Sequence, residues 1–389
     1  MSFNMYIPTR VLFGAGQLDK LNKQKQPGKK ALIVISCGKS TKANGYLLRT
    51  EEQLHLAGVE TVVFDKVQAN PLKSTIMDGG AVARRNSSDF IVALGGGSCI
   101  DAAKAIAIMA TNDGDYWDYI ASGTGKGLPI ANKPLPLVAI TTTAGTGSEV
   151  DAATVVTNEE TNEKTGFVNE ALFPVLAIVD PELMSSVPPK FTAYQGFDAL
   201  FHSTEAYISN GTNLLSDMYA ITAIENVSRN LAKAVKDGND MEAREKVAFG
   251  NTLSGMVMCV GRLTSKHSLE HAMSAYHQQL PHGAGLIMLS KAYYTHFINK
   301  HICDDRFVNM AKAMGMEDAK EPLDFIAMLM KLQEECGVAD LKMSDYGIKP
   351  DEFEKMANNA KETMGKLFKC DRIPLSTEDC IAIYEASYR

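Results

Sequence analysis

The chain has 389 residues, of which 45% are hydrophobic and 22% are charged, and its formal net charge at pH 7 is −7. This length exceeds what one hydrophobic core normally fills, so we expect a globular protein of two domains. The negative charge and the lack of a long basic run argue against nucleic acid or an anionic membrane as the main partner.

Cysteine usage and the absence of apolar runs indicate where the protein works. The seven cysteines are scattered, and none forms a C-x-x-C pair, which is typical of reduced thiols. No segment approaches the roughly 18 consecutive apolar residues of a membrane span, and the N-terminus lacks a secretory signal pattern. We therefore expect a cytoplasmic protein without membrane partners.

Short β-branched runs alternate with helical patterns in the first half of the chain. Their almost continuous apolar character predicts strands of a parallel sheet that is covered by helices on both faces. The sequence thus predicts an α/β domain. Its expected strands are 31–36, 59–64, 90–94, 137–141 and 176–180, with expected helices at 73–86 and 98–110 between them.

A glycine-rich turn follows the third expected strand. Gly95, Gly96 and Gly97 lack a Cβ, so backbone N–H groups there can approach a pyrophosphate, which the N-terminus of the next helix also attracts. Ser98 followed by Asp101 equally fits an ordinary helix N-cap box. The position after a buried strand favours a dinucleotide site, because such ligands bind at the carboxyl ends of parallel strands.

A second polar loop, residues 141–147, follows the next expected strand and carries several threonines. These hydroxyls would point to the same crevice at the sheet edge. A polar connection with strand-ending threonines is the competing interpretation.

The pattern changes after Val187, where Pro188 and Pro189 interrupt the chain. From Thr192 onward, long segments of helical period dominate, and the residues from Thr192 to Gln195 form a capping signature for a helix. We therefore predict an α/β domain over residues 1–187 and an all-helical domain over residues 188–389.

Residues of metal-ligand type are concentrated in the helical half. Asp198 and His202 stand four apart, so they lie on one face of a helix. His267 and His271 repeat this spacing, and His282, between a proline and a glycine, is expected on a loop beyond that helix.

One carboxylate and three imidazoles, from Asp198, His202, His267 and His282, suit Zn or Fe(II). Any one of these histidines alone would more often be a surface or core residue. Their grouping favours a catalytic metal site in the helical domain.

Several segments together resemble the iron-containing (group III) alcohol dehydrogenases, especially their butanol-dehydrogenase-like branch. The resemblance spans the chain and keeps the family's order of motifs. It is carried by YIPTRVLFGAG, GGGSCIDAAKA, TTAGTGSE, IVDPELMSSVPP, the Asp198/His202 pair and HSLEHAMSAYHQQLPHGAG.

The resemblance implies a dinucleotide-binding N-terminal domain and a helical, metal-binding C-terminal domain, the fold shared with dehydroquinate synthase, with the active site between them. Asp198, His202, His267 and His282 match the family's metal ligands. His271 matches an additional active-site histidine, for which we expect a role in relaying a proton. His277 competes with His282 for the fourth ligand position, and the Pro-His-Gly setting of His282 favours the latter.

The resemblance also implies contacts with a nicotinamide dinucleotide. The matching residues are Gly96, Gly97, Ser98 and Asp101 on the glycine turn, Thr142, Thr143 and Thr146 on the second loop, Asn70 on an Asn-Pro turn, and Lys164.

Cofactor preference is predicted from the end of the first strand. NAD-binding folds commonly place an acid there for the ribose 2′-hydroxyl, but residues 36–40 contain none. Gly38 and Ser40 resemble the glycine-serine turn of NADP-using family members, and Lys39 would offset a 2′-phosphate. We therefore expect NADP(H) to be preferred over NAD(H).

The resemblance implies hydride transfer between a nicotinamide ring and a small primary alcohol or aldehyde, with Fe(II), or alternatively Zn, polarising the substrate oxygen. A homodimer or larger homo-oligomer is also implied. Two alternatives remain at this stage. One is a metal- and NAD-dependent lyase like dehydroquinate synthase, and the other is a non-catalytic nucleotide-binding assembly subunit.

Overall fold

The structure is a computed structural model of the chain, and it describes residues 3–389. The chain forms two compact units. The sheet unit comprises residues 6–143 and 147–186, and the helical unit comprises residues 3–5, 144–146 and 187–389. Three separate segments of the chain therefore contribute to the helical unit. Among the described residues, no helix is both long and apolar enough to cross a membrane.

The sheet unit is built on six parallel strands in the order β1-β8-β5-β4-β2-β3. These strands are β1 (Arg10–Phe13), β2 (Lys30–Ser36), β3 (Glu60–Val67), β4 (Phe90–Gly95), β5 (Leu137–Thr141) and β8 (Leu176–Val179). A separate antiparallel hairpin consists of β6 (Ala153–Asn158) and β7 (Glu163–Val168).

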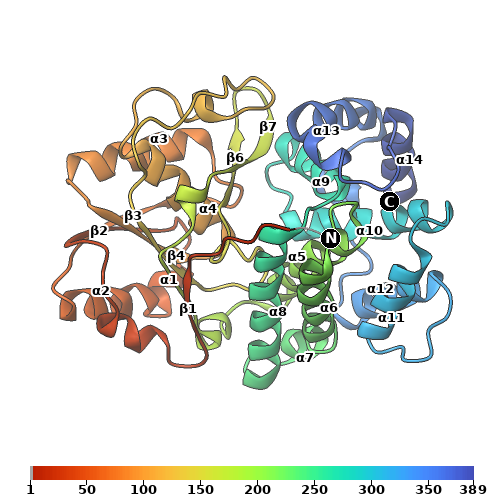
Figure 1. The fold of residues 1–389 in the computed structure, drawn as a ribbon, viewed down its shortest axis with the longest axis horizontal. Helices are drawn as coiled ribbons and strands as arrows, with labels where there is room; N and C mark the ends of the chain where they lie inside the picture. Colours follow the sequence, from red (N-terminus) through yellow and green to blue (C-terminus); the bar gives the residue numbers. More distant parts are fainter. Residues whose placement is uncertain (1–2) are drawn as a thin grey trace. The chain divides into compact units, whose positions relative to one another are not determined.

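Helices cover both faces of the sheet, as Figure 1 shows for α3 and α4 on one side and α2 on the other. The helices of this unit are α1 (Ser40–Ala43), α2 (Tyr46–Leu56), α3 (Lys73–Arg85) and α4 (Gly97–Met109), with short 3-10 helices η1 (Leu18–Lys23), η2 (Tyr116–Tyr119), η3 (Glu170–Leu172) and η4 (Pro181–Met184). Along β2, Leu32 and Val34 join the core with α3 and α4, whereas Ile33 and Ile35 join the core with η1 and α2. This alternation explains the continuous apolar runs in the sequence.

The predicted α/β class is confirmed, and all five expected strands are present with small changes at their ends. Strand β1 and the β6–β7 hairpin were not predicted. Strand β1 has only four residues, and β7 carries Glu163, Lys164 and Gly166 within its six residues, so neither shows a long apolar run.

The helical unit contains no strand within its described residues, as predicted for the second half of the chain. Its helices are α5 (Pro189–Ile208), α6 (Leu214–Ser228), α7 (Leu231–Lys236), α8 (Met241–Val260), α9 (Ser265–Tyr276), α10 (His282–Ile298), α11 (Asp304–Ala313), α12 (Leu323–Glu335), α13 (Phe353–Phe368) and α14 (Thr377–Ser387), with 3-10 helices η5 (Met343–Tyr346) and η6 (Pro350–Glu352).

Helix α5 is the central helix of this unit and packs against α6, α8 and α10. It begins at Pro189, not at the capping signature expected at Thr192. Proline fits the first helical position because its fixed φ suits the helix and its missing N–H is not needed there. The Thr192 hydroxyl instead donates to the Val187 carbonyl and accepts from Arg244.

Candidate metal centre and cofactor site

Helix α5 places the first two predicted ligands one turn apart on a buried face. Asp198 and His202 are 4% and 6% exposed, and His202 Nε2 lies 3.6 Å from Asp198 Oδ1. The four-residue spacing read from the sequence therefore produces the expected geometry. Helix α5 alone supplies one carboxylate and one imidazole.

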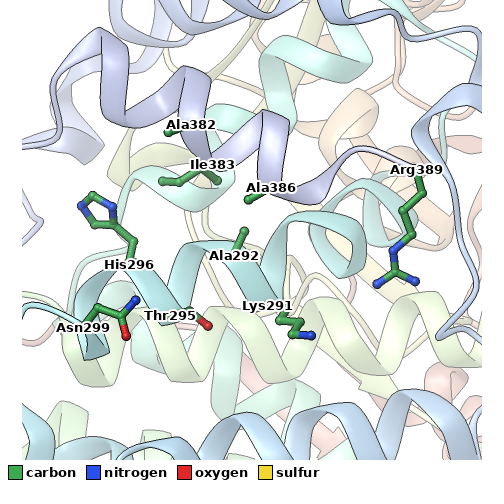
Figure 2. Close-up of a pocket in the computed structure, with 9 residues that line it drawn as sticks. All are labelled: Lys291, Ala292, Thr295, His296, Asn299, Ala382, Ile383, Ala386 and Arg389. Carbon is green, nitrogen blue, oxygen red and sulfur yellow. The ribbon is translucent and has the colours of Figure 1, made fainter.

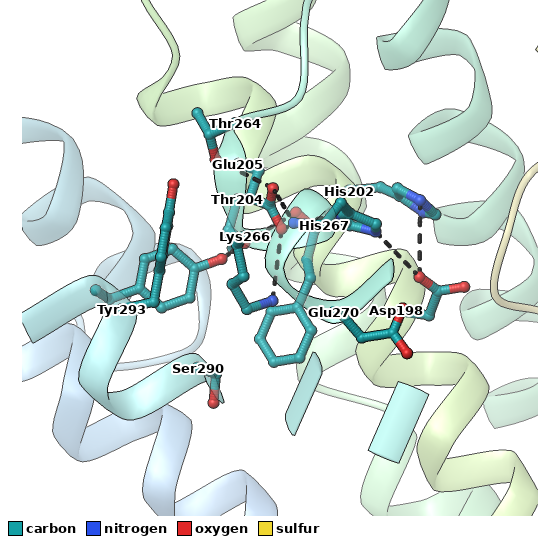
Figure 3. A network of polar contacts seen from close by, with 12 residues as sticks. Asp198, His202, Thr204, Glu205, Thr264, Lys266, His267, Glu270, Ser290 and Tyr293 are labelled. Atoms are coloured by element: carbon teal, nitrogen blue, oxygen red, sulfur yellow. Dashed lines mark hydrogen bonds and ion pairs between the residues drawn. The ribbon is translucent and has the colours of Figure 1, made fainter. Parts of the chain in front are cut away.

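Helix α9 brings His267 to the same carboxylate oxygen, with its Nε2 3.5 Å from Asp198 Oδ1. The imidazole rings of His202 and His267 are stacked, with their centroids 4.5 Å apart. Figure 3 shows these contacts between the two helices. His271, one turn farther along α9, is buried, and its ring centroid lies 6.4 Å from that of His267.

His282 is the first residue of α10, so the predicted loop position is wrong. Pro281 precedes the helix as its N-cap. Gly283 allows the start of α10 to approach α5 closely, because a Cβ there would lie 2.2 Å from the Tyr194 carbonyl oxygen. His282 Nε2 consequently lies 3.5 Å from Asp198 Oδ1.

The four side chains therefore present three imidazole nitrogens around one carboxylate oxygen. Donors about 2.1 Å from a tetrahedral ion lie about 3.4 Å from one another. The three separations from Asp198 Oδ1, at 3.5, 3.5 and 3.6 Å, are of this size. The ligand-type atoms of Asp198, His267 and His282 also lie within 4.8 Å of one another, a group that does not include His202. The chemistry and spacing of the donors fit a divalent transition metal.

Electrostatics support an ionised carboxylate with mixed imidazole states. Burial alone would raise the pKa of Asp198, but His202 and His282 outweigh it and hold that pKa well below its usual range. Burial lowers the pKa of His202 to about 4, which leaves this imidazole neutral at pH 7. Burial also opposes the charge on His267, but Glu205 and Asp198 outweigh it and raise its pKa to about 9.

Two buried glutamates that the sequence did not single out contact the Nδ1 nitrogens of two predicted ligand histidines. Glu205 Oε1 lies 2.7 Å from His267 Nδ1, and Glu270 Oε2 contacts His282 Nδ1. Glu205 stands three residues after His202, and Glu270 stands three residues after His267. Helical spacing was the available signal, because both glutamates share a helix with a predicted ligand.

Lys266 is fully buried beside this cluster. Its Nζ lies 3.5 Å from Glu205 Oε1, as Figure 3 shows for this pair. The same Nζ lies 3.2 Å from the centroid of the Phe201 ring. Burial lowers the pKa of Lys266 to about 8, against the opposing effect of Glu205. The ammonium offsets one of the buried negative charges.

His277, the competing ligand candidate, is the C-cap residue of α9. Its Nε2 lies 3.1 Å from Glu352 Oε2, at the end of η6. His271 belongs instead to a second group, with Glu270 and His282, whose ligand-type atoms lie within 4.8 Å of one another. The geometry therefore favours His282 over His277 near Asp198.

The predicted cofactor residues of the sheet unit follow the carboxyl ends of adjacent strands. Gly38, Lys39 and Ser40 follow β2, the glycine turn follows β4, and Thr142 and Thr143 follow β5. Gly96 lies close to Thr143, because a Cβ on Gly96 would lie 2.7 Å from the Thr143 hydroxyl. Thr146, in contrast, belongs to the helical unit.

The glycine turn leads directly into α4, whose N-cap is Gly96 and which has no side-chain cap. The alternative N-cap box of Ser98 and Asp101 is therefore absent. Asp101 instead accepts hydrogen bonds from the Ser148 hydroxyl, at 2.7 Å, and from the Val155 N–H, at 3.0 Å. Burial raises the pKa of Asp101 to about 6. Its carboxylate holds α4 to the segment around β6.

Asn70 and Lys164, far apart in sequence, form a pair in the sheet unit. Lys164 Nζ donates to Asn70 Oδ1 at 3.0 Å. Asn70 adopts the left-handed backbone region with φ of 53°, a conformation that asparagine tolerates better than most residues. Both side chains are buried at the position where the resemblance expects cofactor contacts.

A separate groove lies between α10 and α14, as Figure 2 shows. Its lining includes none of the predicted site residues, so it does not belong to the candidate metal centre. The residues that line it are Lys291, Ala292, Thr295, His296, Asn299, Ala382, Ile383, Ala386 and Arg389.

Comparisons with known proteins agree with this geometry. Residues 8–181 match the family model described as iron-containing alcohol dehydrogenase, and residues 192–388 match the model of the C-terminal part of the Fe-containing alcohol dehydrogenase family. A 1,3-propanediol dehydrogenase of Klebsiella pneumoniae is 36% identical over 92% of this chain and 93% of its own length. NADH-dependent butanol dehydrogenase A of Clostridium acetobutylicum is 31% identical over the full length of both chains.

Solved structures give the same result. An archaeal halo-thermophilic alcohol dehydrogenase from a Red Sea brine pool superposes with a TM-score of 0.94 at 32% identity, covering 100% of this chain and 99% of that one. A 1,3-propanediol oxidoreductase superposes with a TM-score of 0.90 at 33% identity over the full length of both chains. These matches do not favour a lyase or a non-catalytic subunit. The chain is an oxidoreductase that belongs to the iron-containing alcohol dehydrogenase family.

Proposed function

We propose that this family member interconverts small primary alcohols and aldehydes, uses Fe(II) or alternatively Zn, and prefers NADP(H) to NAD(H). The proposed metal ligands are Asp198, His202, His267 and His282. The observation that carries the proposal is the convergence of three imidazole Nε2 atoms on Asp198 Oδ1 at 3.5–3.6 Å.

The ion, when bound, supplies a Lewis acid that polarises the substrate oxygen. The protein residues determine where this occurs and how protons move. Asp198 stays ionised at neutral pH, and His202 stays neutral, which suits both for ligation. His271, buried one turn from His267, is proposed to carry the substrate's proton on its imidazole. Replacement of His271 by Ala is expected to lower kcat and alter its pH profile, and an unchanged profile would refute this role.

The dinucleotide is proposed to bind the sheet unit at the carboxyl ends of β2, β4 and β5. The glycine turn and the N-terminus of α4 suit a pyrophosphate, because N–H groups and the helix dipole point toward the turn. Asn70, Thr142, Thr143 and Lys164 are proposed to contact the rest of the cofactor, with Asp101 holding α4. Thr146 is proposed as a further cofactor contact.

The NADP(H) preference rests on the turn after β2. Residues 36–40 carry no acid, and Lys39 is exposed. Some relatives, such as the butanol dehydrogenase above, are named as NADH-dependent. A preference for NADP(H) would therefore distinguish the present chain from them. Gly38 has room for a side chain, because a Cβ there would meet only the Ser36 hydroxyl, at 3.5 Å.

Gly38→Asp tests this preference directly. The new carboxylate would repel a 2′-phosphate and accept a hydrogen bond from a 2′-hydroxyl. We expect the ratio of kcat/KM with NADPH to kcat/KM with NADH to fall at least about tenfold, equivalent to about 1.4 kcal/mol. Lys66→Ala, which removes an exposed charge paired with Asp78, serves as a control. Wild-type protein that uses both cofactors equally would contradict the preference.

The activity is tested by anaerobic reduction of butyraldehyde with NADPH and NADH. Metal is first removed from the protein with a chelator, and separate samples are then reloaded with Fe(II) or Zn(II). We expect turnover only after metal is added, and faster turnover with NADPH. Turnover that is equal with and without metal would contradict the metal site, and no turnover with either metal would contradict the proposed substrate class.

We also propose the division into a dinucleotide-binding domain, 1–187, and a metal-binding domain, 188–389, in a cytoplasmic homodimer or larger homo-oligomer. The oligomeric state rests on the family resemblance. Sedimentation equilibrium of the purified protein tests it, and a mass equal to one chain across the concentration range would contradict it.

A further inference from the structure

The three proposed ligand histidines share one orientation. Each presents Nε2 to Asp198 Oδ1. Each also presents Nδ1 to an oxygen of a carbonyl or carboxylate group, and a carbonyl or an ionised carboxylate accepts hydrogen bonds but cannot donate them. The Nδ1 atom is therefore the donor to that oxygen, and Nε2 is the nitrogen that would bind an ion held at Asp198. The three acceptors are the Gly145 carbonyl, at 3.3 Å, and the carboxylates of Glu205 and Glu270.

Glu205 is held firmly in this role. It is fully buried on α5, and Oε1 lies 2.7 Å from His267 Nδ1. Oε2 accepts from the Thr264 hydroxyl at 3.1 Å and from the His267 backbone N–H at 3.4 Å. The ammonium of Lys266 faces Oε1 at 3.5 Å. Contacts on both oxygens fix the plane of the carboxylate, and with it the orientation of the His267 ring.

Glu270 occupies an equivalent position for His282. It is fully buried on α9, and Oε2 contacts His282 Nδ1 at the start of α10. The neighbouring turn of α10 leaves space for it, because a Cβ on Gly285 would lie 2.7 Å from Glu270 Cγ. The packing of α9 against α10 thus accommodates a buried carboxylate at this point.

We infer that Glu205 and Glu270 are positioning residues that hold His267 and His282 in the one tautomer and orientation able to bind the metal ion. A carboxylate that accepts the Nδ1 proton keeps Nε2 unprotonated, and it also raises the electron density of the imidazole. This inference rests on the proposed metal site. It assigns a role to two side chains that would not themselves touch the ion or the substrate.

The charges of the buried groups agree with this role. Asp198, Glu205 and Glu270 are three buried carboxylates, and Lys266 is the buried cation beside them. The buried carboxylates thus outnumber the buried ammonium. Buried charges are costly unless they are paired, so this excess of carboxylates favours a cation at Asp198.

The test measures affinity for Co(II), a spectroscopic probe of such sites, in competition with a chromophoric chelator under anaerobic conditions. Glu205→Gln and Glu270→Gln keep the size of the side chain and an acceptor oxygen but remove the charge. We expect each to weaken Co(II) binding about 10- to 100-fold. Glu270→Leu, which also removes the acceptor, should weaken binding further than Glu270→Gln.

Glu352→Gln is the matched control, because Glu352 pairs with His277, which lies outside the proposed ligand set. Its Co(II) affinity should equal that of the wild type. Gly285→Ala perturbs Glu270 in a second way, since the added methyl group would displace the carboxylate without removing its charge. It should weaken binding in the same direction, and circular dichroism verifies that each variant is folded.

The possible results separate the two hypotheses. Wild-type affinity in folded Glu205→Gln and Glu270→Gln would overturn the positioning role while leaving the metal site intact. A Co(II) absorption spectrum that changes its coordination type in Glu270→Gln would also overturn it, because Glu270 would then be a direct ligand. Failure of the wild type itself to bind Co(II) would overturn the metal site, and the positioning role with it.

Discussion

Among the described residues, Lys104 is fully buried in the sheet unit and Lys266 is fully buried in the helical unit, and the two lysines have different surroundings. In the sheet unit, Lys104 Nζ lies 2.7–2.9 Å from four oxygens, including Asp151 Oδ1. In the helical unit, Lys266 Nζ faces one carboxylate oxygen at 3.5 Å and the Phe201 ring. The same residue at the same burial therefore has different surroundings in the two units.

The two lysines illustrate two roles of a buried positive charge. An ammonium with its hydrogen bonds satisfied serves as a structural cross-link, which for Lys104 joins α4 to the segment around Asp151. An ammonium without close acceptors retains much of its desolvation penalty, and the lowered pKa of Lys266, about 8, reflects this. The desolvation penalty of the Lys266 ammonium is therefore only partly offset, and this ammonium lies beside the proposed metal ligands. Such perturbed buried charges are common at functional sites.

The largest expected effect is that of Lys104→Met. The change would leave Asp151 as a buried carboxylate without its cation, and removal of one partner of a buried pair costs about 3–5 kcal/mol. The free energy of unfolding of the metal-free protein, measured by urea denaturation, should fall by this amount. Lys66→Met, at an exposed ion pair, should change it by less than about 0.5 kcal/mol. Similar losses in both variants would contradict the structural role of Lys104.

The next effect is metal binding, which should stabilise the helical unit. An ion that binds the folded state alone adds about 2.7 kcal/mol when its free concentration is 100 times Kd. We expect chelation to lower the thermal midpoint of the transition that involves the helical unit, and added Co(II) or Zn(II) to restore it. Asp198→Asn should abolish the restoration. An identical thermal midpoint with and without metal would contradict metal binding at Asp198.

Lys266→Met should lower the free energy of unfolding less than Lys104→Met does, by on the order of 2 kcal/mol. The change deprives the buried Glu205 carboxylate of an ammonium that lies 3.5 Å away. The methionine can keep the contact with Phe201, and His267 and Thr264 still donate to Glu205. Urea denaturation of both variants without metal gives the comparison directly. A loss as large as that of Lys104→Met would erase the distinction between the two lysines.

A pH-dependent effect concerns Asp371, another buried group of the helical unit with no cation among its hydrogen-bond partners. Burial raises its pKa from 3.8 to about 7, although the Ser265 N–H and the Tyr293 hydroxyl donate to it. The folded state therefore binds more protons than the unfolded state between about pH 4 and 7, so this group makes stability fall as pH rises through that range.

Asp371→Asn removes this titration and keeps an acceptor oxygen. We expect its free energy of unfolding to be close to that of the wild type near pH 4 and to exceed it at pH 8, by a margin that grows as the pH rises towards 7. Chemical denaturation of both metal-free proteins across this pH range provides the measurement. Parallel pH profiles would exclude a raised pKa for Asp371.

Much of the fold was predictable because its signals are local. Continuous apolar runs identified five of the six strands of the main sheet, since burial on both faces demands such residues. The start of α5 was not predicted correctly. The Thr192 signature was formally adequate, but Pro189 already suits the first turn, and Thr192 bonds to Val187 and Arg244 instead.

The candidate site was predictable where its residues share a helix and less so where they depend on helix packing. The spacing of Asp198 and His202 fixes their common face. In contrast, the pairing of Glu270 with His282 depends on how closely α9 and α10 approach, which no spacing along one helix reveals. The burial of Lys104 and Lys266 was equally hidden, because lysine is normally an exposed residue.

The assignment of residues 144–146 to the helical unit has a consequence for how this protein can be divided. A fragment that begins at Val187 would retain every proposed metal ligand and both glutamates, but it would lose the Gly145 carbonyl that accepts from His202. The two units are therefore interleaved along the chain and are not modules in series. Exchange of helical units between relatives by a single crossover would place the β5–β6 loop of the other parent beside His202, so a functional chimera would need this loop to come from the same parent as the helical unit.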